Sequence, residues 1–95
     1  MQYEIMVILT EDLTELELKI WKLTFIQYLT KLNADNILIE PQGKKKLKYS
    51  IKKKYRGNFI QLNFTMLPTY INQLLKMLSL DINILRFLLF NIDIE

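Results

Sequence analysis

The sequence predicts a single α+β domain in which two helices cover one face of a four-stranded antiparallel sheet. Two observations lead to this prediction. Along the chain the apolar residues switch between the two-residue period of strands and the wider spacing of helices, in the order β-α-β-β-α-β. The 95 residues are 51% hydrophobic, which suffices for one core, so residues 1–95 are assigned to one domain.

The first third of the chain predicts a strand followed by a helix. Tyr3 to Leu9 is a short apolar run with β-branched residues and indicates a strand buried on both faces. Thr14 followed by Glu17 is a capping-box pattern, so a helix should begin there and end at residues 33–36. We expect two adjacent apolar rows to give this helix one wide buried face: Leu16, Ile20 and Leu23 in one, and Leu18, Trp21, Phe25, Leu29 and Leu32 in the other.

The middle of the chain predicts a hairpin. A second strand begins at Ile37 and is interrupted at residues 41–43, and an alternating stretch follows. Arg56-Gly57-Asn58 predicts the turn, because Gly and Asn tolerate positive φ angles. Alternation should place apolar residues on one strand face and charge on the other. The apolar set is Leu47, Tyr49, Ile51 and Tyr55, and the polar set is Lys46, Lys48, Ser50, Lys52, Lys54 and Arg56.

The last third predicts a strand, a helix and a strand. Phe59 to Met66 alternates, Pro68 should begin a helix, and residues 84–94 form the final strand. The complete order is the split βαβ arrangement of ferredoxin-like domains. Two right-handed crossovers would place both helices on one face of the sheet and leave the other face open for a partner.

The composition argues against an enzyme. The chain has no histidine and no cysteine, and no Gly-rich phosphate loop or acid cluster at metal-ligand spacing. No apolar run approaches the roughly 18 residues needed to span a bilayer. We therefore expect no catalytic residue, no cofactor, no metal site, no small-molecule substrate and no membrane partner.

The charge distribution points to a polyanion site. Eight of the thirteen Lys and Arg residues lie between Lys44 and Arg56, while the rest of the chain holds five against ten acids. Such lysines can simply keep an edge strand soluble, or bind an acidic protein or membrane surface. They can also neutralise successive phosphates, since alternate residues of a strand are spaced about 6.5–7 Å apart. We favour nucleic acid, bound with little sequence preference.

The aromatic residues leave a further alternative open. Residues 56–62 partly match the third-strand signature of an RNA-recognition motif, which stacks bases on sheet aromatics, but Asn58 and Ile60 occupy aromatic places. Phe59, Phe87 and Leu89 are then expected either on an open apolar face for a protein partner or in the core. The alternatives are therefore a single-stranded RNA binder of that kind and a ferredoxin-like protein interaction module.

Four segments resemble one protein family over about residues 3–90. They are Tyr3-Glu4-Ile5, the string GKKKLKYSIKK from Gly43, the string RGNFIQLNF from Arg56, and Ile84 to Leu88 with its Arg86. Together they resemble the ribosomal protein S6 family of the bacterial small subunit.

This resemblance implies a structural, non-catalytic constituent of the small ribosomal subunit. Such a protein would bind the central domain of 16S rRNA as a heterodimer with ribosomal protein S18, next to other small-subunit proteins. The residues expected by matching position to bind RNA are Lys44, Lys45, Lys46, Tyr49, Lys53, Arg56 and Arg86. The remaining lysines of the basic strand, Lys48, Lys52 and Lys54, are expected to bind RNA with them. Those expected to contact the protein partner are Tyr3, Glu4, Phe59, Phe87 and Leu89.

The pattern is closest to plastid and cyanobacterial members of that family. Plentiful Ile, Lys and Asn also suit an AT-rich genome. We therefore expect a protein of plastid (chloroplast) ribosomes in the stroma, with the bacterial cytoplasm as the alternative.

Overall fold

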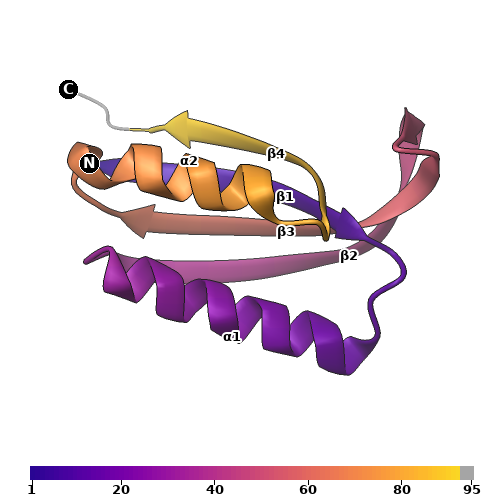
Figure 1. Ribbon diagram of the computed structural model, residues 1–95, viewed down its shortest axis with the longest axis horizontal. Coiled ribbons are helices and arrows are strands. Elements are labelled where there is room, and N and C mark those ends of the chain that lie inside the picture. The colour runs from indigo at the N-terminus through magenta and orange to yellow at the C-terminus, as the bar shows by residue number, and fades with distance from the viewer. Residues whose placement is uncertain (93–95) are drawn as a thin grey trace.

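A computed structural model of the chain, described here for residues 1–92, is a two-layer α+β domain (Figure 1). Its elements are β1 (Gln2–Thr10), α1 (Glu15–Lys31), β2 (Asp35–Ile51), β3 (Lys54–Thr65), a 3-10 turn (Pro68–Tyr70), α2 (Ile71–Leu80) and β4 (Ile84–Asn91). The four strands form one antiparallel sheet in the order β2-β3-β1-β4. The predicted ferredoxin-like order is confirmed. The final strand ends at Asn91, and the predicted residues 93 and 94 lie outside the described part.

The core lies between the two helices and one face of the sheet. Alternate residues of β1 and β3, among them Ile5, Val7 and Leu62, are completely buried there against Leu29 of α1 and Leu74 of α2. Both helices lie on the viewer's side of the sheet in Figure 1. The intervening residues Glu4, Met6 and Ile8 are only half-buried, so the prediction that this strand is buried on both faces is wrong. No helix of the described chain covers the second face, which we call the open face.

The start of α1 follows the sequence prediction. The Thr14 hydroxyl oxygen accepts a hydrogen bond from the Glu17 backbone N–H at 3.1 Å, and the Glu17 carboxylate accepts one from the Thr14 N–H at 3.0 Å. These two bonds satisfy donors that no helical carbonyl reaches. Glu15, also in the first turn, complements the helix dipole.

The expected wide buried face of α1 is wrong. Leu16, Ile20 and Leu23 are 67%, 54% and 53% exposed, whereas the second row packs on the core. At about 100° of rotation per residue, the two rows are centred about 170° apart and so lie on opposite sides of the helix. We call Leu16, Ile20 and Leu23 the outer row.

The hairpin turn lies at Lys52-Lys53, and the predicted turn at residues 56–58 is wrong. Lys52 and Lys53 have φ angles of 49° and 65°, and Ile51 pairs with Lys54 across the turn. Positive φ at both central residues matches the twist of a two-residue hairpin. The interruption at residues 41–43 is a bulge within β2, where Gly43 has φ 82°.

Gly57 lies inside β3, opposite Thr10 of β1, where the backbones approach closely. A Cβ atom on Gly57 would lie 2.5 Å from the Ile8 Cγ2 atom and 3.1 Å from the Leu9 carbonyl oxygen. We therefore expect Gly57→Ala to lower the free energy of unfolding by roughly 1–3 kcal/mol, as overpacking does. Urea denaturation measures this free energy. The double variant Ile8→Ala/Gly57→Ala should recover part of the lost stability, because it removes the Ile8 Cγ2 atom that the added Cβ would meet. Equal stability of Gly57→Ala and the parent chain would contradict this reading.

Candidate nucleic-acid interface

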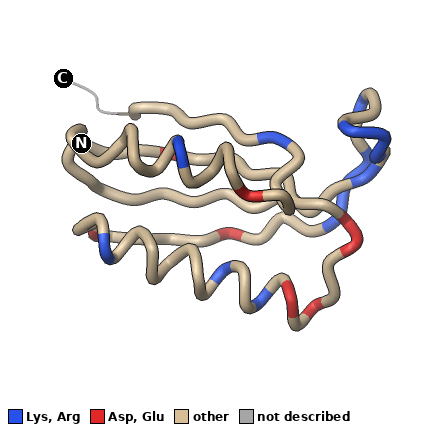
Figure 2. Tube along the Cα trace, in the orientation of Figure 1, with Lys and Arg blue, Asp and Glu red and all other residues tan. Residues whose placement is uncertain are grey.

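The basic residues gather on a projecting hairpin. Pairing of β1 with β3 stops at Thr10 and Gly57, so the β2–β3 ladder continues beyond the rest of the sheet (Figure 1). We call residues 44–56 the basic arm. Figure 2 shows its Lys and Arg side by side on this projection, with acidic residues in the neighbouring loop after β1. Apart from Lys54, every Lys and Arg of the arm is exposed.

The arm does not keep the simple alternation that the sequence predicts. Lys46 pairs with Arg56 and Ile51 with Lys54, so β2 has four residues between these pairs where β3 has one. Such a bulge bends the strand and redirects side chains. Leu47 is buried and Ile51 half-buried, as expected of an apolar face, but Tyr49 and Tyr55 are exposed.

A pocket of about 380 Å³ lies at the base of the arm. Its lining combines three apolar residues, two aromatic rings and four cations: Ile8, Leu47 and Ile51; Tyr49 and Phe59; and Lys45, Lys46, Lys48 and Arg86. We call it the arm pocket. Arg86, from β4, is brought in by the sheet and not by sequence proximity.

Two contacts organise this pocket. The Arg86 Nη1 atom donates a hydrogen bond to the Tyr49 hydroxyl oxygen at 3.1 Å, which ties β4 to the arm. The Lys45 Nζ atom lies 5.5 Å from the centroid of the Phe59 ring, within the range of a cation–π interaction. Positive charge therefore lies at the Tyr49 hydroxyl group and over the Phe59 ring, and cations beside aromatic rings suit a nucleotide, which has a phosphate and a flat base.

Two cations of the arm are instead held by acids of the β1–α1 loop. The Lys54 Nζ atom lies 2.6 Å from the Asp12 Oδ2 atom, and the Arg56 Nε atom lies 3.8 Å from the Glu11 Oε2 atom. The hydrogen bond and the charge of Lys54 lower the pKa of Asp12, and Asp12 raises the pKa of Lys54 in the same two ways. These cations are less available to phosphate than Lys45, Lys46 and Lys48.

The Lys54–Asp12 pair makes stability depend on pH. Because the folded pKa of Asp12 lies below its unfolded value, the contribution is present above the unfolded pKa and is lost as the pH falls through the folded one. We expect Asp12→Asn to be less stable than the parent chain at about pH 7, with the difference shrinking below about pH 4. Melting temperatures measured from about pH 7 to about pH 2 test this. A difference that stays constant over the whole range would contradict it.

A polar chain crosses the open face. The Gln61 Nε2 atom donates a hydrogen bond to the Glu4 carboxylate, and the Gln42 Nε2 atom donates one to the Gln61 Oε1 atom at 2.9 Å. The Lys45 Nζ atom then donates to the Gln42 Oε1 atom at 3.3 Å. This chain fixes Lys45 relative to the sheet.

Of the five residues expected to contact a protein partner, the structure places two on the open face. Glu4 lies there opposite Asn63 in the β1–β3 pairing, with its carboxylate accepting the hydrogen bond from Gln61, and Phe59 lies there opposite Ile8. Tyr3 is buried in the core, with its ring 5.8 Å from that of Phe64. Tyr3 therefore does not lie on the open face, and its contact with a protein partner stays a prediction.

Phe87 and Leu89 take the second of the two positions expected for them, because they pair with Val7 and Ile5 and pack against the core. The open face of β4 instead carries Leu88 and Phe90, 45% and 48% exposed, which sequence reasoning missed. All four residues are apolar, so alternation alone assigns neither pair to a face.

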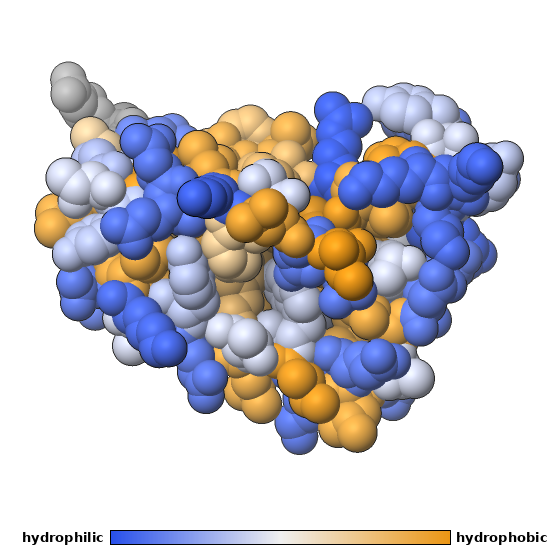
Figure 3. Space-filling model, viewed as in Figure 1, coloured by the Kyte–Doolittle hydropathy of each residue, from blue (hydrophilic) through white to orange (hydrophobic). Residues whose placement is uncertain are grey.

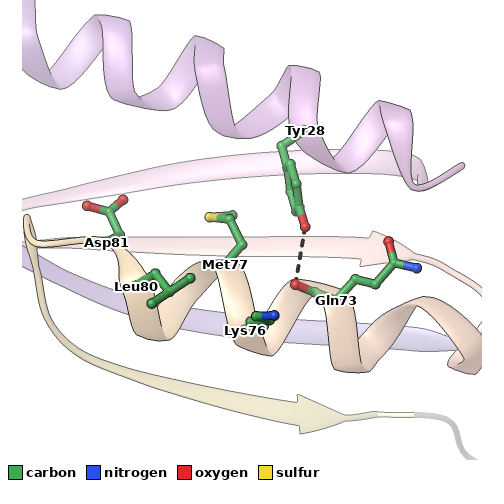
Figure 4. Close-up of a pocket in the computed structure, with 6 residues that line it drawn as sticks. All are labelled: Tyr28, Gln73, Lys76, Met77, Leu80 and Asp81. Carbon is green, nitrogen blue, oxygen red and sulfur yellow. Dashed lines mark hydrogen bonds between the residues drawn. The ribbon is translucent and has the colours of Figure 1, made fainter.

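The helix layer contains a separate pocket of about 540 Å³ between α1 and α2 (Figure 4). Its lining includes Tyr28, whose hydroxyl group donates to the Gln73 carbonyl oxygen at 3.2 Å, with Met77 and Leu80 beside it. Lys76 is its one Lys or Arg, so it lacks the concentrated positive charge of the arm pocket.

Other classes of site receive no support from residues 1–92. Within that part of the chain, no three His, Cys, Asp or Glu side chains are placed to hold a metal ion. No helix there is long and apolar enough to cross a bilayer.

Comparison with known proteins gives a consistent picture. Residues 2–91 match the family described as ribosomal protein S6. The small ribosomal subunit protein bS6c of Phaeodactylum tricornutum is 44% identical over 95% of this chain and 92% of its own length. The bS6c protein of Trieres chinensis is 42% identical over 95% and 94%, and protein bS6 of Campylobacter jejuni (strain RM1221) is 36% identical over 92% and 70%.

Among solved structures, the 30S ribosomal protein S6 of Thermotoga maritima superimposes with a TM-score of 0.87. The match covers 94% of this chain and 84% of that one at 22% identity, which supports the fold.

Proposed function

Because the chain belongs to the ribosomal protein S6 family, whose members are ribosomal proteins and not enzymes, we propose that it is a structural constituent of the small ribosomal subunit. In this proposal the basic arm binds the central domain of 16S rRNA, and the open face binds ribosomal protein S18. The relatives named bS6c favour a plastid ribosome, with a bacterial one as the alternative.

The arm pocket is the observation that carries the RNA-binding part of the proposal. Lys45, Lys46 and Lys48 line it, and none of them belongs to an ion pair among residues 1–92. No carboxylate therefore offsets these three charges, and each can neutralise a phosphate and release a counterion. Tyr49 is exposed beside them, so its ring can stack on a base. Lys44 at the start of the arm and Lys52 and Lys53 at its turn are also exposed, and they extend the positive field.

The open face is the observation that supports a protein partner. Leu88 and Phe90 of β4 and Leu38 of β2 are exposed there. Leu38 is on the same face as Glu4, since Leu38 and Glu4 both pair with Asn63 of β3. Apolar side chains gain nothing from phosphate but gain from burial against a protein surface. We assign this surface to ribosomal protein S18, which would leave the arm free for rRNA.

The RNA-recognition-motif alternative gains less support. Phe59 does lie on the open face, but it is half-buried and lies under the Lys45 ammonium group. A stacking platform needs an accessible ring at that place. The interaction-module alternative treats the arm lysines as solubilising groups, and binding measurements separate it from the main proposal.

The direct experiment is equilibrium binding to a 16S central-domain fragment, with and without ribosomal protein S18, over a range of salt concentrations. We expect S18 to tighten binding and added salt to weaken it. Leu88→Gln/Phe90→Gln should abolish most of the tightening by S18 while leaving the salt dependence unchanged. Absence of binding at low salt, even with S18 present, would overturn the proposal. Binding that is lost in Phe59→Ala but kept when several arm lysines are changed to Ala would favour the recognition-motif alternative.

A further inference from the structure

The side chains of the open face form rows that cross the sheet from β2 to β4. Residues paired across neighbouring strands point to the same face, so the strand register identifies the members of each row. One row contains Leu38, Asn63, Glu4 and Phe90. The next row, one step closer to the arm, contains Glu40, Gln61, Met6 and Leu88. We call these two rows the distal rows, since the row beyond them reaches Arg86 and the arm pocket.

The charges of the open face are segregated by sign. The strand segments around the distal rows, residues 2–6, 35–40, 61–65 and 88–91, contain no Lys or Arg, and their charged residues are Glu4, Asp35 and Glu40. Figure 2 shows the same division, with acidic positions on β2 before the arm and basic ones on the arm. In Figure 3, hydrophilic side chains cover the arm at the right of the view. The distal half of the sheet is therefore negative, whereas the arm end is positive.

No positive group of residues 1–92 forms an ion pair with Glu4. The described chain gives its carboxylate one hydrogen bond, from the neutral Gln61 Nε2 atom. Lys45 is linked to it only through the side-chain amides of Gln42 and Gln61. The N-terminal ammonium donates to a backbone carbonyl oxygen after β3 at 3.2 Å, and Lys31 belongs to α1 in the helix layer. Because Glu4 is half-buried, its charge is partly removed from water without a counter-charge.

A second acceptor beside Glu4 also lacks a donor. The Asn63 Oδ1 atom is buried and has no hydrogen-bond partner within the described chain. Asn63 pairs with Glu4 in the β1–β3 register, and it lines a pocket of about 260 Å³. A buried acceptor without a donor costs free energy, which a donor entering from a partner would recover. The centre of the distal rows is therefore suited to N–H donors that carry positive charge.

Exposed apolar side chains flank these two acceptors. Leu38 and Phe90 lie at the two ends of the same row, and Leu88 lies beside Phe90 in the next one. The ends of the row are three strand spacings apart, or about 14 Å. A partner surface that matches this row has apolar side chains at its two ends and a cation between them.

From these observations we propose that the distal rows dock a protein segment in which an Arg, flanked by apolar side chains, pairs with Glu4. Arg fits better than Lys, because its planar guanidinium group carries five N–H donors and can reach two acceptors at once. The inference rests on the proposed function, and it specifies the chemistry by which the open face selects its protein partner. Acids at one end of the sheet and lysines at the other would direct protein and RNA to separate surfaces.

Two other occupants fit the distal rows less well. RNA would bring phosphates against Glu4 and Glu40, with no Lys or Arg in these rows to offset the repulsion. A second copy of this chain could place its basic arm against these acids, but it would then cover the lysines that the proposed function assigns to rRNA. The test therefore includes both occupants as outcomes.

Calorimetric titration with ribosomal protein S18 as the probe compares the parent chain with Glu4→Gln and Glu15→Gln. Glu4→Gln removes the charge and keeps an acceptor for the Gln61 Nε2 atom. Glu15→Gln is the matched control, because it removes an exposed carboxylate of α1, off the open face. We expect Glu4→Gln to bind S18 about tenfold more weakly, with less dependence on salt, and Glu15→Gln to bind like the parent chain. Thermal melting checks that both variants are folded.

A photocrosslinking amino acid at position 38 identifies the partner segment. In the complex with S18 and the 16S fragment, we expect a crosslink to a segment of S18 that carries an Arg between apolar residues. Changing that Arg to Glu should weaken binding to the parent chain, and Glu4→Arg should restore part of the lost affinity.

Equal affinity of Glu4→Gln and the parent chain for S18 would overturn the inference. The proposed function would stand in that case if Leu88→Gln/Phe90→Gln still weakened S18 binding. A crosslink to a segment without Arg, to rRNA or to a second copy would also overturn the inference. If S18 does not bind the parent chain at all, the proposed partner is wrong, and this inference fails with it.

Discussion

Replacing Lys45, Lys46 and Lys48 together with Gln is expected to weaken binding to 16S rRNA by at least about tenfold near 0.1 M salt. These three lysines line the arm pocket and have no acidic partner within residues 1–92. Losing three phosphate contacts should also reduce the slope of log K against log salt by about 2 to 3. A filter-binding or fluorescence titration at several salt concentrations measures both quantities.

Lys54→Gln is the matched control for this prediction. Lys54 belongs to the same arm, but its ammonium group is 2.6 Å from the Asp12 carboxylate. Lys54→Gln should change the salt slope by less than one third of the change seen in the triple variant. The arm pocket would not be the phosphate-binding surface if the triple variant kept the salt slope of the parent chain. The same would follow if Lys54→Gln lowered the slope as much as the triple variant does.

Leu62→Ala is expected to lower the free energy of unfolding by about 2–5 kcal/mol. Leu62 is completely buried in β3, between neighbours on β1 and β2, so truncation leaves a cavity in the core between the sheet and the helices. In a domain of this size such a loss is a large part of the total stability. Urea denaturation at constant pH measures it.

The exposed Ile82 provides the comparison, and Ile82→Ala should change the free energy of unfolding by no more than about 0.5 kcal/mol. RNA affinity of Leu62→Ala, measured where the variant is still folded, should equal that of the parent chain. A cost below about 1 kcal/mol for Leu62→Ala would mean that the sheet is not packed as described.

Much of the fold follows from local patterns in the sequence. The capping box at Thr14 and Glu17 identifies the start of α1, because both of its bonds depend only on residues three apart. The alternation from Ile60 to Met66 identifies the core face of β3. Both predictions are confirmed because each depends on a local feature. The helix start depends on hydrogen bonds between nearby residues, and the core face of β3 depends on alternation between a buried and a more exposed side of the strand.

The features that sequence reasoning missed depend on contacts between distant segments. Glycine is common in turns, so Gly57 was expected at one. In the structure it lies within β3, where β1 approaches it closely, and the turn lies at Lys52-Lys53. In β4, apolar residues on both faces hide which pair meets the helices. The outer row of α1 was assigned to the core because apolar character alone does not reveal burial.

The same limit applied to the candidate site. The eight charges of the arm look equivalent in the sequence, yet Asp12 and Glu11 hold two of them. Arg86, 30 residues beyond the end of the arm at position 56, joins it through the Tyr49 hydroxyl group. Only the pairing of β1 with both β3 and β4 brings these groups together.

Lysine acetylation footprinting of the free chain and of its complex with S18 and 16S rRNA tests the central claim most directly. The reactivity of each lysine is read by mass spectrometry, so the arm and the helix layer are compared within one sample. We expect Lys45, Lys46 and Lys48 to become protected in the complex, while Lys76 on α2 keeps its reactivity. Unchanged reactivity of the arm lysines, or equal protection of Lys76, would contradict the assignment of the basic arm to rRNA.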